Sequence, residues 1–246
     1  MTNSAISYTT AINEVLDHIL ATQMDNVEKA ADIVANAIAQ DGILYTFGTG
    51  HSHVTAEDLC YRAGGLIAVD AILERSLTGH EKVAQSEHME RVPGIAKVIW
   101  NYYEITPKDA LIVISNSGRN AAPIEMAEQA HENHVPVIGV TSLAHSKGTT
   151  SRHPSGKKMY EFCDVVIDNL CPKGDCLLHL DNLEQPVGAG SSVATLFILN
   201  MIVVQSVQNL LDRGVVPPVG MSGNLDGSYE YNKKFFDRYK SRIKIW

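Results

Sequence analysis

Three short segments rich in Gly, Ser, Thr and Asn combine the residue types that bind small anions. They are Gly48-Thr49-Gly50-His51-Ser52-His53, Ser115-Asn116-Ser117-Gly118-Arg119-Asn120 and Thr141-Ser142. Glycine lets an anion approach backbone N–H groups, and hydroxyl side chains donate hydrogen bonds to its oxygens. Each segment follows a short apolar run, so all three are expected at the carboxyl ends of neighbouring strands. Together they predict a site for a phosphorylated small molecule.

The second segment also carries signals for the start of a helix. Asn120 is placed to cap that helix with its side chain, and Pro123 falls in the first turn, where proline is tolerated. The positive end of the helix would attract an anion. We therefore expect Ser115, Asn116, Ser117 and Asn120 to anchor the phosphate.

Nucleotide binding is the weaker interpretation of the same segments. No GxxxxGK[ST] pattern is present, which excludes a P-loop. Gly48-Thr49-Gly50 begins a dinucleotide fingerprint, and Asp70 follows Gly50 by 20 residues, where an acid that binds ribose belongs. His53, however, occupies the third glycine position.

Short apolar runs predict the strands that position these segments. The runs are Ile43–Phe47, Leu66–Val69, Ala110–Ser115, Pro136–Thr141 and Asp164–Asp168. Helical spacing lies between most of them, over Val54–Arg62, Met89–Tyr103 and Pro123–Asn133. Alternating strands and helices predict an α/β fold with a doubly wound, five-stranded parallel sheet.

The two ends of the chain read as helical extensions of this unit. Apolar stripes predict two N-terminal helices within residues 8–40, with a break near Thr22–Asp25. Ser191–Leu211 is a long apolar helix, and Tyr229–Ile243 is a last helix within a tail over 214–246. With a core over about 30–211, we expect one domain over 1–246.

Composition limits the classes of function. The 246 residues are 45% hydrophobic and carry a formal net charge of −8, which suits a folded domain and disfavours a nucleic-acid partner. The most apolar run, Val193–Val204, is 12 residues long, so we expect no membrane span. Four cysteines without a CxxC pair predict reduced thiols in a cytoplasmic protein. We expect no metal and no cofactor, and we expect a homodimer or larger assembly because the helices offer excess apolar surface.

The first two segments resemble the two phosphosugar loops of the SIS (sugar isomerase) domain. The resemblance rests on Phe47–Ser52 and Ser115–Asn120 and covers most of the chain. Stretches such as Ser142–Ser146 and Ser151–Gly156 further resemble an uncharacterised bacterial family of proteins with a single SIS domain. The resemblance implies a flavodoxin-like sheet flanked by helices, sites at subunit interfaces, and a phosphate held by Ser115, Ser117 and Asn120. Asn120 stands where that family usually has Thr or Ser.

The resemblance also suggests where a catalytic base lies. Glu184-Gln185-Pro186-Val187 is similar to the Glu-x-x-Val that supplies the base in glucosamine-6-phosphate synthase isomerase domains. The helix glutamate of the sedoheptulose-phosphate isomerases and of the etherases falls on Arg62, which is expected to pair with Asp58 instead. Glu74, after the second strand, and His145, after Thr141-Ser142, are the other candidate catalytic residues.

These observations favour a phosphosugar-binding protein that acts as an aldose–ketose isomerase. Gly50, His51 and Ser52 would take the sugar end. A non-catalytic sensor of phosphosugars and a lyase or etherase acting on an amino-sugar phosphate are the alternatives. The basic cluster of Arg152, His153, Lys157 and Lys158 reads as a solvated loop in preference to a phosphate clamp.

Overall fold

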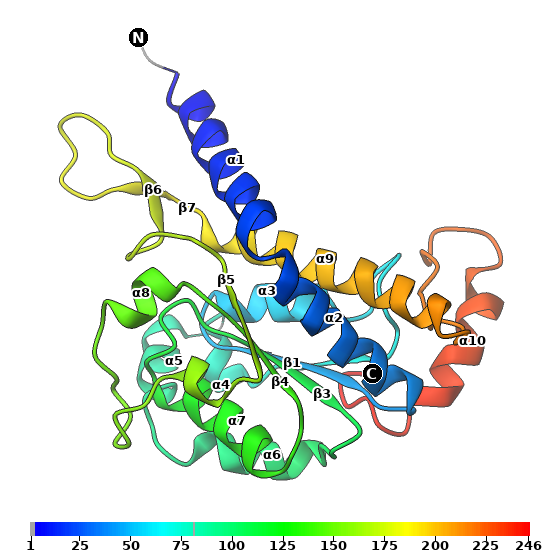
Figure 1. The fold of residues 1–246 in the computed structure, drawn as a ribbon. Coiled ribbons are helices and arrows are strands. Elements are labelled where there is room, and N and C mark those ends of the chain that lie inside the picture. The colour runs from blue at the N-terminus through cyan, green and yellow to red at the C-terminus, as the bar shows by residue number, and fades with distance from the viewer. Residues whose placement is uncertain (1–2, 81) are drawn as a thin grey trace.

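A five-stranded, all-parallel sheet forms the centre of the protein (Figure 1). The computed structural model describes residues 3–80 and 82–246. The strand order is β2-β1-β3-β4-β5, the flavodoxin-like order, so the predicted doubly wound sheet is confirmed. The strands are β1 (Leu44–Gly48), β2 (Val69–Ile72), β3 (Ala110–Ile114), β4 (Val137–Thr141) and β5 (Val165–Asp168).

Helices cover both faces of the sheet. On one side lie α2 (Met24–Ala39), α3 (Ser52–Asp58) and α9 (Ser191–Asp212), and on the other lie α6 (Ile95–Tyr103) and α7 (Ala121–Glu132) (Figure 1). Every residue of the four strands β1 to β4 is consequently buried. This double cover explains why the strands read as continuous apolar runs.

The remaining elements surround this three-layer core. They are α1 (Ser4–Thr22), α4 (Arg75–Thr78), α5 (Val83–Met89), α8 (Leu143–Lys147), a 3₁₀ turn over Met159–Phe162, α10 (Ser228–Tyr239), and the two-stranded hairpin of β6 (Cys176–Leu178) and β7 (Val187–Ala189). The N-terminal break predicted near Thr22–Asp25 lies at Gln23, between α1 and α2.

Several predicted boundaries are wrong. The helix expected over Met89–Tyr103 is two helices, because Pro93 and Gly94, the latter with φ 88°, interrupt it. The strand expected over Leu66–Val69 begins only at Val69, since Leu66 instead pairs with Val219 of the C-terminal tail. The helix expected to reach Arg62 ends at Asp58, although the predicted Asp58–Arg62 ion pair is present.

The hairpin of β6 and β7 is an insertion that the apolar pattern did not predict. Its strands are only three residues long and half-buried, too short for a clear alternation of apolar residues. The Tyr8 hydroxyl of α1 donates to the Ala189 carbonyl at 2.9 Å and so ties the hairpin to the N-terminal helix. The hairpin loop projects away from the sheet (Figure 1).

Helix α9 is, among the described residues, the one helix long and apolar enough to cross a membrane by length and composition. In the structure it packs along α2, and its inner face is part of the protein core. The Ser206 hydroxyl, fully buried on this face, lies 3.2 Å from the Ala31 carbonyl of α2. Its high apolar content is therefore used in packing within this domain.

Candidate functional site

The three predicted segments meet at the carboxyl edge of the sheet. The Thr141 hydroxyl donates to the Ser115 carbonyl at 2.7 Å, and the Ser142 N–H donates to the Asn116 carbonyl at 3.1 Å. Asn169, which follows β5, donates to the Asn116 side chain at 2.9 Å. These bonds fix the second segment, Ser115–Asn120, against its neighbours and hold it in one shape.

The second segment has the geometry of an anion-binding loop. The Gly118 N–H donates to the Ser115 hydroxyl at 3.1 Å, and Gly118 has φ 54°. A side chain at Gly118 would also lie 3.1 Å from the Ser146 hydroxyl oxygen, so the turn requires glycine. The N–H groups of Ser117, Arg119 and Asn120 have no acceptor among the described residues. Together with the start of α7, these donors form a concave cradle for an anion.

A polar cleft of about 140 Å³ lies beside this loop. Its lining comprises His51, Ser52, Thr55, Ile114, Asn116, Asn169, Asp175, Ser191, Ser192 and Thr195. The Asp175 carboxylate accepts hydrogen bonds from the Ser191 N–H and hydroxyl, each at 2.7 Å, and so caps α9. Hydroxyl, amide and carboxylate groups at this density suit the hydroxyl groups of a sugar.

A second cavity, of about 360 Å³, lies on the other side of His51. It is lined by Gly50, His51, His53, Val54, Thr78, Gly79, His80, Val83, Ser86 and Glu87. The rings of His53 and His80 are 5.7 Å apart, and His80 is hydrogen-bonded to the Thr78 hydroxyl at 2.6 Å. The part of the chain that the structure describes has no cluster of three His, Cys, Asp or Glu side chains placed to hold a metal ion. His51 is the residue common to both cavities.

Glu90 joins the first and second loops, and sequence reasoning missed it. Its carboxylate accepts from the Thr49 hydroxyl at 2.7 Å and from the Asn120 side-chain amide at 2.6 Å. Burial raises the pKa of this carboxyl, opposed by the hydrogen bond from Thr49 and by the nearby charges of Arg91 and Arg152. Glu90 follows a short exposed helix, and nothing in its local sequence distinguishes it from a surface acid.

The prediction that the Asn120 side chain caps α7 is wrong. Asn120 occupies the N-cap position, but its side chain makes no hydrogen bond to the helix. The amide nitrogen donates to Glu90, and the amide oxygen accepts from the Arg152 guanidinium at 3.2 Å. The Ala122 N–H, in the first turn of α7, donates to the Glu90 carbonyl at 2.9 Å.

The three predicted catalytic residues do not line either cavity. Glu184 is exposed in the loop between β6 and β7 and lines neither cavity, so its position before α9 does not bring it into the cleft of its own chain. Glu74 is half-buried at the N-cap position of α4. His145 lies in α8, where burial, followed by the charges of Arg119 and Lys158, lowers its pKa.

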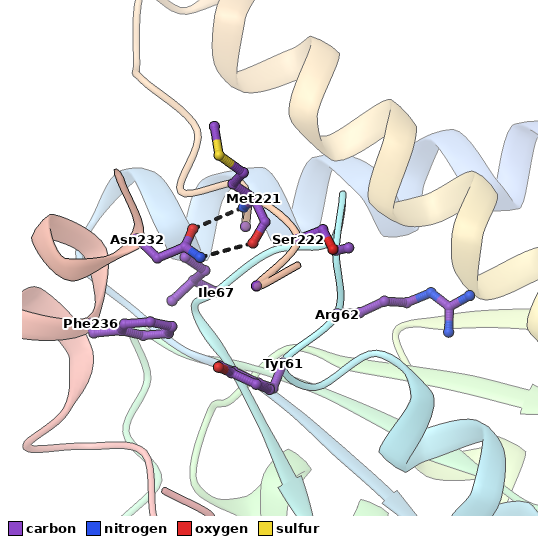
Figure 2. A pocket seen from close by; sticks show the side chains of 10 residues that line it. Tyr61, Arg62, Ile67, Met221, Ser222, Asn232 and Phe236 are labelled. Carbon is purple, nitrogen blue, oxygen red and sulfur yellow. Dashed lines mark hydrogen bonds between the residues drawn. The ribbon is translucent and has the colours of Figure 1, made fainter. Parts of the chain in front are cut away.

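A further cavity, of about 230 Å³, lies at the amino edge of the sheet (Figure 2). The Asn232 side chain forms its upper wall by pairing with the N–H and carbonyl of Met221, both at 2.8 Å. Arg62 lies at the rim, where its side chain extends away from Phe236 (Figure 2). None of the predicted binding or catalytic residues lies in this cavity.

Asp70, the acid considered for a ribose, is fully buried in β2. Its carboxylate accepts from the N–H groups of Lys244 and Ile245 at 2.7 and 3.3 Å. Asp70 therefore anchors the C-terminal tail. Because it is not available to bind a ribose, the acid that the dinucleotide interpretation requires is absent from the site.

Comparison with known sequences agrees with this geometry. The model of the SIS domain matches residues 7–142. A UPF0309 protein of Halalkalibacterium halodurans is 41% identical over 239 residues, which cover 97% of this chain and 99% of the relative. A UPF0309 protein of Geobacillus kaustophilus is 40% identical, with 97% and 95% covered.

Solved structures share the fold at low sequence identity. Phosphoheptose isomerase GmhA of Neisseria gonorrhoeae has a TM-score of 0.53 at 17% identity, covering 85% of this chain and 97% of that one. The NanR protein of Vibrio vulnificus, complexed with ManNAc-6P, has a TM-score of 0.54 at 12% identity, covering 99% and 71%. The sugar isomerase domain of an RpiR transcription factor of Sphaerobacter thermophilus has a TM-score of 0.51 at 15% identity, covering 86% and 94%.

The family match spans more than half of the chain, and the curated relatives are similar over nearly their full length. SIS domain proteins bind phosphosugars. The chain belongs to the SIS domain family and, within it, to the UPF0309 proteins.

Proposed function

We propose that this protein binds a sugar phosphate at the carboxyl edge of its sheet. The phosphate lies on the loop Ser115–Asn120, and the sugar extends into the cleft bordered by His51. The observation that carries this proposal is the set of unpaired N–H groups of Ser117, Arg119 and Asn120 at the start of α7. Buried or half-buried N–H groups normally have an acceptor, and a phosphate would supply it.

Local charge supports the same ligand. The chain as a whole is acidic, with a net charge of −8, yet basic side chains gather around this loop. Burial, followed by the charges of Arg119 and Lys158, lowers the pKa of His145, and burial followed by the charge of Arg119 lowers the pKa of Lys158. The buried Lys158 ammonium donates to the Ser146 carbonyl at 2.7 Å. This concentration of positive charge favours a small anion over a polymer.

A thermal-shift panel tests the binding proposal. The probes are fructose 6-phosphate, glucosamine 6-phosphate, arabinose 5-phosphate and N-acetylmannosamine 6-phosphate, each beside its unphosphorylated sugar. A ligand that binds only the native state stabilises it by about 2.7 kcal/mol at 100 times Kd. We expect at least one phosphorylated probe, and no free sugar, to raise the melting temperature. Equal shifts by both members of every pair would contradict the proposal.

We further propose that the protein interconverts aldose and ketose forms of its ligand. The reaction moves a proton between adjacent carbons and needs a base within hydrogen-bonding reach of that proton. His51 is the titratable group that borders both cavities, while the Asp175 carboxylate is occupied by Ser191. Glu184, on the projecting hairpin, is available to the cleft of a second copy, as expected if sites form at subunit interfaces.

A non-catalytic sensor is the second candidate, favoured by one specific observation. None of Glu184, Glu74 and His145 lines a cavity at the carboxyl edge of this chain. Exchange of deuterium from solvent into the sugar carbon next to the carbonyl separates the two functions. Exchange by wild type that collapses in His51→Gln or Glu184→Gln, with binding retained, supports the isomerase. Tight binding without exchange for any probe supports the sensor.

We also propose that the protein forms a homodimer or larger assembly through α9. Val204 and Leu211 on its outer face are 68% and 54% exposed, and Phe197, Met201 and Val204 border an apolar hollow of about 350 Å³ between α2 and α9. Val204→Asp should shift the sedimentation coefficient to that of a 26.9 kDa monomer. The matched control is Val98→Asp, at a valine of α6 on the other side of the sheet that is 72% exposed, and a monomeric wild type would contradict the proposal.

A further inference from the structure

The Asn120 side chain is diverted from the role that its position suggests. At the start of a helix that follows a phosphate loop, a short polar side chain is expected to bind a helix N–H or the ligand. The Asn120 side chain makes no hydrogen bond to the helix, and its amide lies between the Glu90 carboxylate at 2.6 Å and the Arg152 guanidinium at 3.2 Å. Asparagine also has no hydroxyl group to donate to an anion at this loop.

Arg152 is held next to this loop. Its N–H donates to the Arg119 carbonyl at 2.8 Å, which places the segment after α8 against the second loop. Its guanidinium has no carboxylate partner within salt-bridge distance among the residues that the structure describes. Its one side-chain hydrogen bond within the described part of the chain, to Asn120, uses one of its five N–H donors.

The charges around Arg152 are arranged as they would be for an absent anion. Burial and the nearby Arg119 and Arg91 lower the pKa of Arg152, opposed by Glu90 and Glu87. The exposed Arg152 guanidinium is thus repelled by Arg119 and Arg91, while the Glu90 carboxylate already accepts hydrogen bonds from Thr49 and Asn120. A phosphate dianion at the loop would relieve that repulsion, and a guanidinium fork matches phosphate oxygens in a bidentate manner.

We propose that Arg152 contacts the phosphate of the ligand, where Asn120 has no hydroxyl group to donate a hydrogen bond. Asn120 and Glu90 are positioning residues in this arrangement: Glu90 orients the Asn120 amide so that its oxygen faces Arg152. The inference rests on the proposed function, since it assigns a residue to the same site. It also replaces the interpretation of the Arg152 segment as a solvated loop.

The Glu90 carboxylate determines which way the Asn120 amide points. A carboxylate only accepts hydrogen bonds, so it selects the NH₂ end of the amide and leaves the oxygen for Arg152. Glutamine at position 90 could keep its oxygen on Asn120 and donate its NH₂ group to the Thr49 hydroxyl, so it would leave Asn120 as it is. In Glu90→Leu the acceptor is removed, so nothing holds the NH₂ end of the Asn120 amide and its oxygen is no longer directed at Arg152. This variant therefore acts on Arg152 with little change in side-chain size.

The experiment measures Kd by calorimetry for the panel sugar phosphate that binds wild type most tightly, with inorganic phosphate as the second probe. We expect Arg152→Gln to weaken phosphate-containing probes by about 10- to 100-fold, the usual loss for a charged hydrogen bond, and Arg152→Lys to weaken them less. Lys157→Gln, which removes an exposed charge from the same segment, is the matched control and should change Kd less than about 2-fold. Melting temperatures without ligand verify that each variant is folded.

A double-mutant cycle tests the positioning role. If Glu90 acts through Arg152, the Glu90→Leu change weakens binding in the wild-type background and has little further effect in Arg152→Gln. Fully additive losses would overturn the positioning role. Wild-type binding together with equal, small losses in Arg152→Gln and Lys157→Gln would overturn the Arg152 assignment alone. A wild-type protein that binds neither the sugar phosphates nor inorganic phosphate would overturn both this inference and the proposed function.

Discussion

The two edges of the central sheet bury charge in different ways. At the amino edge, Asp70 and Asp109 are almost fully buried, and each carboxylate is satisfied by the chain itself. Asp109 accepts from the Ile43 and Thr106 N–H groups at 2.8 and 2.7 Å and from the Arg242 guanidinium at 2.7 Å. At the carboxyl edge, backbone N–H groups and guanidinium donors remain without acceptors in the described chain.

This difference indicates that the amino edge of the sheet stabilises the fold and that the carboxyl edge binds a ligand. A buried charge whose hydrogen bonds are all supplied by the protein fixes the fold, since removing a partner leaves the others unpaired. Buried donors without acceptors reduce stability unless something else binds them. The Arg119 Nε, the His145 Nδ1 and the Ser146 hydroxyl are buried groups without a partner at the carboxyl edge, and the Tyr239 hydroxyl is another, near Asp41 at the amino edge. The buried carboxylates of the amino edge are satisfied by the chain itself, whereas most of the unpaired groups in the described chain gather at the carboxyl edge, as a ligand site requires.

We expect the largest effect from removing a buried carboxylate at the amino edge. Asp109→Ala leaves the N–H groups of Ile43 and Thr106 unpaired and the half-buried Arg242 without its carboxylate, so we expect a loss of about 3–5 kcal/mol in unfolding free energy. Urea unfolding followed by circular dichroism measures it. Asp237→Ala, which breaks the exposed pairs with Lys233 and Lys240 in α10, is the control and should cost less than about 1 kcal/mol. Similar losses in both variants would show that the amino edge is not a structural centre.

The next largest effect is expected at the carboxyl edge, where a substitution should weaken ligand binding without changing stability. Ser117 is half-buried, and its hydroxyl makes no bond within the described chain, so Ser117→Ala should leave the melting temperature within about 1 °C of wild type. Loss of a hydrogen bond to a charged group should weaken sugar-phosphate binding by about 1.5–3 kcal/mol.

Ser115→Ala provides the comparison within the same loop. The Ser115 hydroxyl accepts from the Gly118 N–H at 3.1 Å, so this variant should lower both stability, by about 1 kcal/mol, and affinity. If Ser117→Ala binds sugar phosphates as tightly as wild type, the loop does not hold the phosphate.

The sequence predicted the fold and the loops because both depend on local patterns. Apolar runs ending in Gly, Ser and Asn mark strands that stop at one sheet edge, and the structure brings Thr141, Ser115 and Asn116 together there. The links between distant segments were not predicted, because no period or motif encodes them. Glu90 meets Thr49 across 41 residues, and Arg152 meets Asn120 across 32. The hairpin that carries Glu184 was also missed, and Glu184 lines neither of the two cavities at the carboxyl edge of its own chain.

The smallest expected effect concerns the pH dependence of stability and follows from Glu90. Burial raises the pKa of its carboxyl above the usual value near 4.5, so the folded protein binds the proton more tightly than the unfolded chain does. The contribution of Glu90 to stability is therefore greatest below its unfolded pKa and is lost as pH rises through the folded pKa. In Glu90→Gln this titration is absent.

We therefore expect the unfolding free energy of wild type, relative to Glu90→Gln, to fall as pH rises from about 4 to 7. Urea unfolding of both proteins at matched pH values measures the difference. Glu28→Gln is the control, because Glu28 is an exposed acid on α2. A difference that rises with pH would mean that Thr49, Asn120 and the nearby arginines hold the Glu90 carboxylate more strongly than burial penalises it. Such a result would separate Glu90 from Asp70 at the amino edge, where burial also raises the pKa of a carboxyl. A fall would show that burial penalises the Glu90 carboxylate more than the hydrogen bonds from Thr49 and Asn120 stabilise it.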